Sequence, residues 1–314
     1  MSLASKIDYL KDRAFMFQKV RSFFLSKNVL EVDTPLLSHS APIDEHIDVM
    51  KVDLQNCNGY LHTSPEYAMK RLLSLGIGDI FQLGHVFRLG EFGRLHNPEF
   101  TLIEWYRTSL SYPEFIKETL ELMHLFLGPL PSSQISYRDA LKLYADIDYV
   151  LASKEDLLKA VKNHAIELSS EESWNTEALL HLLMGSIVEP RLGKNELLVL
   201  MDYPSSQSAL AKTEKKEDEL VAKRFEIYYQ GVELANGYLE LTDALEQKNR
   251  FIQSNEKRKL SGKESLPIDE NLILALQQGL PECCGVAVGF DRLFMLRHQT
   301  QTLGEILPFS WNEI

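Results

Sequence analysis

The 314-residue sequence has few cysteines and no long apolar run. Its three cysteines, Cys57 and the adjacent pair Cys283 and Cys284, form neither an even disulfide framework nor a spaced set of metal ligands, so we expect buried or half-buried thiols. Residues 1–20 mix charges with apolar side chains, unlike a signal peptide. No later stretch approaches the length that spans a bilayer. We therefore expect a cytosolic protein without membrane contact.

Positive charge is also in short supply, with 33 Lys and Arg against 45 Asp and Glu and a formal net charge of −12. Nucleic-acid binding depends on lysine and arginine residues that displace counterions from phosphates. This balance disfavours a general affinity for nucleic acid, although a local basic face stays open. With 45% hydrophobic and 25% charged residues, the chain predicts one large globular domain, or one domain with insertions.

Local patterns predict both helices and strands. Apolar residues at helical spacing predict a helix over 7–24, and residues 29–35 then predict a strand that a proline stops. A helix over 64–76 is expected because Ser64 can cap it and Gly76 suits its end. The buried face of the first helix should carry Leu10, Ala14, Phe17, Val20 and Phe24.

A hairpin is predicted from two alternating stretches, 79–88 and 99–107, joined by a long polar loop. The second stretch places Phe100, Leu102, Glu104 and Tyr106 on one face. Charged residues beside a sheet would explain Glu99 and Arg107. That explanation fails for Glu104, because a carboxylate on an apolar face needs a partner or costs several kcal/mol, on the order of buried-charge penalties.

The remaining pattern points to an α+β domain around an antiparallel sheet, since helices interrupt the strands without regular alternation. Residues 112–190 predict a helical insertion. Strands are expected over 196–204 and 224–241, and a charged helix with a solvated face over 242–260. Finally, a strand of small residues should run into a helix over 284–298.

Three groups of residues are candidates for a functional site. Arg88, with the arginine, histidine and asparagine of the following turn, can donate to a phosphate chain. Glu233 and Glu240 could converge on a magnesium ion or an ammonium group, but charges on an edge strand explain them equally well. Gly285 and Gly289 allow a ligand close to the backbone before Arg292, with tight packing as the alternative, and their spacing fits neither a Rossmann nor a P-loop pattern.

The order of these segments carries a resemblance. "VLEVDTP", the FR…HNPEF hairpin and "GVAVGFDR" resemble motifs 1, 2 and 3 of class II aminoacyl-tRNA synthetases, and the likeness covers nearly the whole chain. "HTSPEYAMKRLL", "HNPEFTLIEWY" and "ELANGYLELTDA" are similar to the lysyl-tRNA synthetase branch. The chain begins at the helix before motif 1, so we expect residues 1–314 to form a catalytic domain without an anticodon-binding domain. That truncated architecture resembles the bacterial elongation factor P (R)-β-lysine ligases.

The resemblance implies a reaction, two cofactors and two partners. ATP, with Mg²⁺, would activate (R)-β-lysine as an adenylate that is then transferred to a lysine of elongation factor P. Class II cores usually pair through motif 1, which implies a homodimer, whereas tRNA is disfavoured as a partner. No side-chain nucleophile is needed, because the adenylate is itself the activated intermediate.

The resemblance also implies roles for individual residues. Arg88 and Arg292 would be catalytic, neutralising charge at the α-phosphate and at the β/γ-phosphates. The implied ATP-binding set is Arg88, Leu89, Gly90, Glu91, His96, Asn97, Phe100, Glu233, Leu234, Gly289 and Arg292. The implied substrate-binding set is Ser64, Pro65, Glu66, Glu104, Tyr106, Asn236, Tyr238, Glu240 and Ala287. Glu233 and Glu240 would also bind magnesium.

Two departures from the family pattern leave alternatives open. Gly90 stands where motif 2 carries glutamate, so either Glu91 substitutes through a shifted turn, or ATP is held more loosely, or the activity is altered. Ala287 replaces an expected glycine, and one methyl group, worth roughly 1 to 3 kcal/mol, could disfavour α-lysine. A tRNA-charging enzyme and a non-catalytic paralogue that acts as a binding or regulatory module are the alternative functions.

Overall fold

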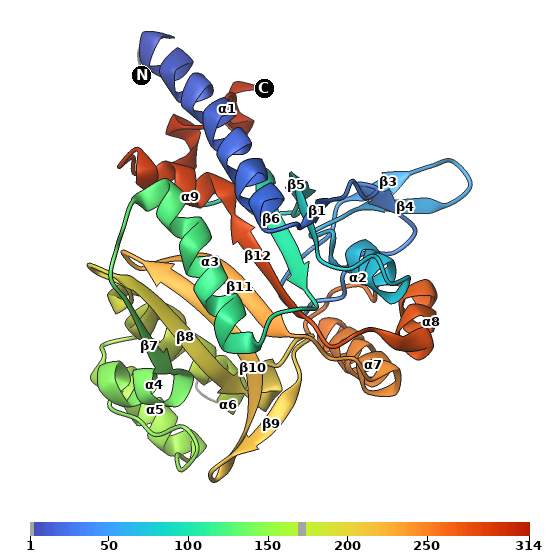
Figure 1. The fold of residues 1–314 in the computed structure, drawn as a ribbon. Helices are drawn as coiled ribbons and strands as arrows, with labels where there is room; N and C mark the ends of the chain where they lie inside the picture. Colours follow the sequence, from blue (N-terminus) through green and yellow to red (C-terminus); the bar gives the residue numbers. More distant parts are fainter. Residues whose placement is uncertain (1–2, 169–173) are drawn as a thin grey trace. The chain divides into compact units, whose positions relative to one another are not determined.

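The computed structural model describes residues 3–168 and 174–314, which form two compact units (Figure 1). The first unit combines Met1–Gly128 with Leu239–Ile314, and the second is Pro129–Tyr238. Within the described ranges, no helix has both the length and the apolar character that crossing a membrane requires.

The first unit contains most of the motif segments. Its helices are α1 (Leu3–Ser26), α2 (Glu66–Ser74), α3 (Tyr112–Leu127), α7 (Ala244–Leu260), α8 (Glu270–Gly279) and α9 (Phe290–Arg297), with 3₁₀ turns at Leu303–Glu305 and Trp311–Glu313. Its strands are β1 (Leu30–Glu31), β2 (Leu37–Ser38), β3 (Lys51–Asp53), β4 (Asn58–Leu61), β5 (Ile80–Phe87), β6 (Glu99–Arg107) and β12 (Cys284–Gly289).

The main sheet of this unit has the strand order β1-β5-β6-β12. The predicted hairpin is confirmed: β5 and β6 pair antiparallel, with Phe87 opposite Glu99 at the loop end. β12 pairs antiparallel with the other edge of β6, and β1 adds a parallel pair to β5. A small second sheet, β2-β4-β3, lies between the predicted strand over 29–35 and the predicted helix over 64–76, where no strand was predicted.

Helix α1 is longer than predicted, and its buried face is only partly the expected one. Val20 and Phe24 are buried as predicted, and Phe24 stacks on Phe81 with ring centroids 4.3 Å apart. Leu10 and Ala14 are instead exposed. The buried stripe continues through Met16 and Arg13, because the guanidinium of Arg13 finds a buried carboxylate that the local pattern does not reveal.

Motif 3 forms the predicted strand and helix, β12 and α9. At the start of α9, Asp291 is buried and accepts hydrogen bonds from Arg13 Nη1 at 2.5 Å and from the Thr101 N–H at 2.7 Å. Arg13 also donates to the Thr101 hydroxyl at 2.8 Å. This buried network joins α1, β6 and α9, and it fixes the first turn of the helix that carries Arg292.

The strands of the second unit follow the order β11-β10-β8-β7, and β9 pairs with β10. β7 and β8 pair in parallel, whereas β8–β10 and β10–β11 are antiparallel. Its elements are β7 (Ser132–Ser136), α4 (Tyr137–Ala145), α5 (Lys154–Asn163), α6 (Thr176–Leu183), a π-helical turn (Met184–Val188), 3₁₀ turns (Glu189–Arg191 and Ser205–Gln207), β8 (Leu197–Pro204), β9 (Thr213–Lys216), β10 (Glu219–Tyr229) and β11 (Val232–Leu239).

The α+β class and the dominance of antiparallel pairing are confirmed in both units. The segment 112–190 contains α3 to α6 but also strand β7, and its boundaries as an insertion stay a prediction. Residues 169–173 of that segment lie outside the described residues. All three cysteines are thiols, and the predicted burial is confirmed for Cys283 and Cys284 but wrong for Cys57, which is exposed.

One expectation about surface charge was wrong. Arg107 is buried, at 7% exposure, and contacts Asp79 at 3.1 Å and Glu118 at 3.0 Å. Helix α7 has the predicted solvated face. Its Arg258 is nevertheless buried and donates to the carbonyls of residues 44, 47 and 264. Both arginines are buried because partners distant in sequence satisfy their guanidinium groups.

Candidate active site

The candidate site lies on one face of the sheet in the first unit, with β6 between β5 and β12. Directly opposed residues of antiparallel strands point to the same face, so each residue of β6 defines a row. From one end to the other, the rows are Ile80–Tyr106–Gly285, Gln82–Glu104–Ala287, Gly84–Leu102–Gly289 and Val86–Phe100. The predicted face of β6 is confirmed, and Ala287 is the cross-strand neighbour of Glu104.

Three carboxylates gather at the Tyr106 end of this face. Glu104 is 2% exposed, and its carboxylate accepts hydrogen bonds from the Ser64 hydroxyl at 2.7 Å and the Tyr106 hydroxyl at 2.9 Å. Glu240 is fully buried, and its backbone N–H donates to the carbonyl of Cys283 at 3.0 Å. Glu66, in the first turn of α2, completes the set. The sequence predicted all three carboxylates as substrate-binding residues.

A fourth charged residue, Lys70, was missed by the sequence analysis. It lies on α2 with its side chain 2% exposed, and its ammonium is 2.7 Å from Glu66 Oε1 and 2.5 Å from Glu240 Oε2. Apart from this ion pair, no hydrogen bond from the described residues reaches the carboxylate of Glu240. The Glu66–Lys70 spacing of four residues was the one available signal, but that spacing is ordinary on exposed helix surfaces.

Burial dominates the electrostatics of this pocket, because it disfavours every charged form. It raises the pKa of Glu104 to about 8, aided by the charge of Glu66 and opposed by the two hydroxyl donors. It also raises the pKa of Glu240 to about 7, against the attraction of Lys70. Burial lowers the pKa of Lys70, but the Glu240 and Glu66 carboxylates outweigh it and raise that pKa. The pocket is therefore short of positive charge.

Gly285, on β12, has no room for a side chain beside this pocket. A Cβ added there would overlap Oε1 of Glu240 and the ring of Tyr106. The packing explanation of this glycine is therefore correct, and the absent side chain is what lets Glu240 lie against β12.

Cationic groups gather around the hairpin loop. Arg88 lies over the ring of Phe100, with its Cζ 5.1 Å from the centroid, and its buried Nε has no hydrogen-bond partner in the described part of the chain. Arg292, on the first turn of α9, contacts Nε2 of His96 at 2.9 Å. Burial lowers the pKa of His96, and the charges of Arg292 and Arg88 lower it further. The two arginines and the histidine thus form one electropositive cluster suited to a phosphate chain.

The hairpin loop carries Gly90, at the position of the motif 2 glutamate, and Glu91 beside it. Gly90 has φ +80°, a left-handed conformation that disfavours other side chains. The carboxylate of the next residue, Glu91, lies 3.4 Å from Arg88 Nη1. Leu89 is exposed, and its N–H donates to the carbonyl of Asp48. The geometry supports the alternative in which Glu91 substitutes through a shifted turn.

Asn97 and Pro65 serve local structure in the described chain. Asn97 donates to the carbonyl of Glu99 at 2.7 Å and accepts from the N–H of Trp311 at 3.1 Å. Pro65 precedes α2, whose first N–H, from Glu66, donates to the Ser64 hydroxyl oxygen at 3.0 Å. Their contacts with ligands stay predictions.

Four predicted site residues lie on β11, in the second unit: Glu233, Leu234, Asn236 and Tyr238. In the antiparallel register with β10, Asn236 is opposite Glu226, and Asn236 Oδ1 is buried without a partner in the described chain. Glu226 is itself paired with Arg224 at 2.5 Å. Convergence of these four residues with those of the first unit stays a prediction.

The magnesium assignment fits the described residues only in part. Glu240 is buried and already paired with the ammonium of Lys70, so it does not have the surroundings of a magnesium ligand. Among residues 3–168 and 174–314, no three His, Cys, Asp or Glu side chains are grouped in a way that could hold a metal. Glu233, the other assigned carboxylate, lies on β11, and its contact with magnesium stays a prediction.

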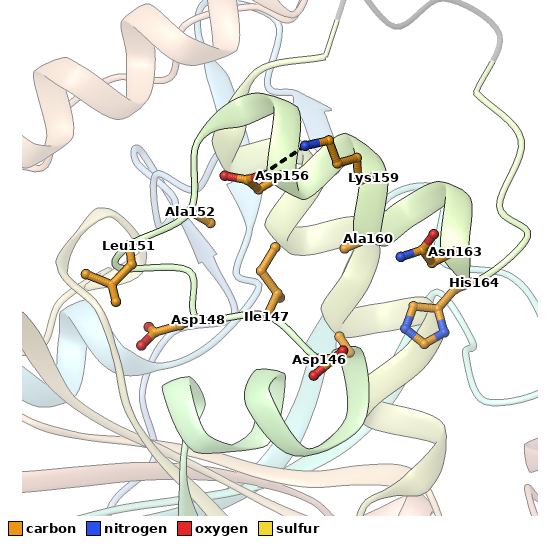
Figure 2. Close-up of a pocket in the computed structure, with 11 residues that line it drawn as sticks. Asp146, Ile147, Asp148, Leu151, Ala152, Asp156, Lys159, Ala160, Asn163 and His164 are labelled. Atoms are coloured by element: carbon orange, nitrogen blue, oxygen red, sulfur yellow. Dashed lines mark hydrogen bonds and ion pairs between the residues drawn. The ribbon is translucent and has the colours of Figure 1, made fainter.

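A separate pocket of about 550 Å³ opens in the second unit, between α4 and α5 (Figure 2). Two of the three aspartates that line it have ion-pair partners: Asp148 binds Arg138 at 2.7 Å, and Asp156 lies 3.4 Å from Lys159. None of the predicted site residues lines it. We therefore assign it no part in the candidate site.

Comparison with known proteins places this geometry in a family. The model of the family "tRNA synthetases class II (D, K and N)" matches residues 4–313. The chain is 41% identical over 313 residues to the "Elongation factor P--(R)-beta-lysine ligase" of Salmonella gallinarum, which covers 98% of this chain and 96% of that protein. The ligase of the same name from Klebsiella pneumoniae matches with the same identity and coverage. The chain therefore belongs to the class II tRNA synthetase family of the D, K and N type.

Proposed function

We propose that this chain uses ATP to activate (R)-β-lysine and transfers it to a lysine side chain of elongation factor P. The observation that carries the proposal is the similarity to the ligases of that name, which extends over 98% of the chain. A pocket of buried carboxylates beside an electropositive cluster supports it, because a dibasic amino acid needs the first and ATP needs the second.

In the proposed first step, the substrate carboxylate attacks the α-phosphorus of ATP. A new carboxylate–phosphorus bond forms, the bond to the β-phosphate oxygen breaks, and pyrophosphate leaves with the electron pair. Arg88 and Arg292 neutralise the charge that develops on the phosphate oxygens. The ring of Phe100 stacks on adenine in this proposal. The contact between Arg88 and Phe100 fixes the guanidinium relative to that ring.

In the second step, the neutral ε-amine of the acceptor lysine attacks the acyl carbon of the adenylate. An amide bond forms, the amine loses a proton, and AMP leaves. The nucleophile comes from the protein partner, which agrees with the absence of a catalytic cysteine or serine from the proposed roles.

We assign the choice between β-lysine and α-lysine to the residues around Glu104, on the site face of β6. Among the described residues, the hydrogen-bond partners of Glu104 are hydroxyl groups rather than a cation, so it is the carboxylate best placed to take an ammonium group. Ala287 lies directly opposite it on β12. The methyl group of Ala287 thus borders the position where α-lysine and β-lysine differ, and one methyl is worth roughly 1 to 3 kcal/mol of discrimination.

Magnesium enters the proposal as the counterion of ATP. Mg²⁺ is usually held by one or two carboxylates together with substrate phosphates and water. Glu233 is the carboxylate assigned to it here. When bound, the ion would add to the charge neutralisation that the two arginines provide.

The experiment that tests this function is ATP–pyrophosphate exchange with (R)-β-lysine and with α-lysine, followed by transfer of label to elongation factor P and to lysine tRNA. We expect exchange that favours β-lysine and label that arrives on the protein. Label on tRNA would identify a tRNA-charging enzyme instead. Absence of exchange with either amino acid would favour a non-catalytic paralogue.

A further inference from the structure

Lys70 is the feature of the pocket that the proposed reaction does not use. Its side chain is 2% exposed and its ammonium bridges Glu66 and Glu240, at 2.7 and 2.5 Å. A buried cation inside a pocket for cations is unexpected, because it competes for the same carboxylates as the substrate. Some gain must offset the cost of removing it from water, which is several kcal/mol on the order of buried-ion penalties.

The gain lies in the geometry of the carboxylates. Glu66 is on α2 and Glu240 follows β11, and within residues 3–168 and 174–314 the ammonium of Lys70 is the group that contacts both. Two mutually repelling carboxylates in a dry pocket would turn apart or take up protons. One ammonium between them holds both in place and leaves their remaining oxygens available.

The charge count of the pocket fits a dibasic ligand. The charged groups that face one another here are Glu66, Glu104 and Glu240, with Lys70 as the cation, and Tyr106 is the remaining titratable neighbour. The raised pKa values of Glu104 and Glu240 leave these two carboxyl groups partly protonated near neutral pH in the substrate-free pocket. Binding of ammonium groups favours their ionised forms, and three negative charges with one positive charge then give a formal charge of −2. The two ammonium groups of β-lysine or α-lysine match that charge.

We propose that Lys70 is a positioning residue that holds Glu66 and Glu240 in the substrate-binding arrangement and sets the charge of the pocket to match two ammonium groups. It touches neither the phosphates nor the reacting carboxylate. The proposal rests on the proposed function for the identity of the ligand, but the ion pairs themselves are a property of the substrate-free chain.

Steady-state exchange kinetics of Lys70→Gln test this role. A residue that orients ground-state binding groups changes KM and leaves kcat, so we expect the KM for (R)-β-lysine to rise about tenfold or more with kcat within about threefold. The KM for ATP should stay close to that of the wild type. A merely structural lysine would lower the folded fraction, and therefore kcat, without changing KM.

The matched control is Arg71→Gln, which removes the neighbouring cation from the exposed side of the same helix. Both KM values of this variant should equal those of the wild type. An unchanged or lower KM for β-lysine in Lys70→Gln would overturn the proposal, since it would mean that Lys70 is indifferent to the substrate or competes with it.

A double-mutant cycle separates this inference from the proposed function. Urea unfolding of Lys70→Met, Glu240→Gln and the double variant requires no substrate. We expect Lys70→Met to lower the midpoint strongly in the wild-type background, because it leaves a buried carboxylate unpaired, and much less in Glu240→Gln. If the effects of the two single substitutions on the urea midpoint add up to the effect of the double variant, the ion pair between Lys70 and Glu240 is contradicted. If the cycle shows coupling between Lys70 and Glu240 but the wild-type enzyme shows no ATP–pyrophosphate exchange, the proposed function is overturned and the ion pair is not.

Discussion

The chemistry of the site depends on single carboxylates whose surroundings differ. Glu240 and Glu66 share the ammonium of Lys70, whereas Glu104 relies on the hydroxyl groups of Ser64 and Tyr106. Hydroxyl groups can hydrogen-bond to either protonation state of a carboxyl group, and the two hydroxyl groups around Glu104 do not offset its burial, which raises its pKa to about 8. Glu104 is therefore the residue at which substrate binding and protonation are most directly linked.

The raised pKa of Glu104 predicts how stability depends on pH. The ordinary glutamate value is 4.5, and the folded-state pKa is about 8. Between these values the folded protein holds more protons than the unfolded chain, so the free energy of unfolding should fall as the pH rises. The expected loss between about pH 5 and about pH 8 is on the order of a few kcal/mol.

Urea unfolding of the substrate-free protein across this pH range measures the effect. Glu104→Gln should remove the part of the slope that extends from about pH 7 to about pH 8. A slope of the same sign should persist below about pH 7, because burial also raises the pKa values of Glu240 and Glu189 to about 7. Equal slopes in the wild type and Glu104→Gln would show that Glu104 ionises normally.

Gly285 offers a second test at the scale of one residue. A methyl group there would overlap Glu240 and Tyr106, so Gly285→Ala should cost about 1 to 3 kcal/mol of unfolding free energy. Gly289→Ala is the matched control on the same strand, because its added Cβ meets Arg292 only at 3.7 Å, an ordinary contact. Urea midpoints compare the two, and similar losses would refute the close-approach explanation.

Arg292 gives the corresponding prediction for the phosphate end. Arg292→Ala should abolish adenylate formation, measured as pyrophosphate exchange, because the charge on the departing phosphates would lose its partner. Its unfolding midpoint should stay near that of the wild type. Near-normal exchange in this variant would remove Arg292 from the phosphate clamp.

At the scale of elements, the hairpin β5–β6 sets the two ends of the site. The alternation of β6 places Phe100 at the phosphate end and Glu104 and Tyr106 at the amine end of one face. The first turn of α9 meets the loop of this hairpin through the contact between Arg292 and His96. The position of that turn depends on the buried pair of Arg13 and Asp291.

This pair predicts a large effect from a residue far from the substrate. Arg13→Met leaves the buried carboxylate of Asp291 without its cation, and removing one partner of a buried pair costs about 3 to 5 kcal/mol. Lys11→Met, on the exposed side of α1, should change stability by less than about 0.5 kcal/mol. Unfolding free energies of the two variants check the prediction, and equal losses would argue against the network.

At the scale of the whole molecule, we propose that the chain forms a homodimer through α1 and the segment after it. Large apolar side chains are exposed there: Leu25 at 77%, Leu30 at 52% and Leu36 at 42%. Light scattering at micromolar concentration should give twice the chain mass of 36.0 kDa. Leu25→Glu should shift the mass toward a monomer, whereas Leu151→Glu, an equally exposed leucine of the second unit, should not. A monomeric wild type would contradict the proposal.

Much of the fold was predictable because the spacing of apolar residues and the residues that favour turns act over short stretches of the chain. The hairpin, the helix with Ser64 and Gly76 at its ends, and the strand that enters α9 each follow from patterns within about twenty residues. The small sheet β2-β4-β3 was missed because its strands are only two to four residues long. Such short strands carry too little alternation to distinguish them from a loop.

The family, the order of the motifs and the carboxylates Glu66, Glu104 and Glu240 as candidates for amine binding can be recognised from the amino-acid sequence alone. Three other features are known only from the folded chain: Lys70 bridges two of these carboxylates, Arg13 is buried against Asp291, and Ala287 stands opposite Glu104. The difference arises because sequence patterns report on residues that are close together in the chain. Periodicity reports which face of an element is buried, but the partner of a buried charge lies far along the chain and is known only when the elements pack.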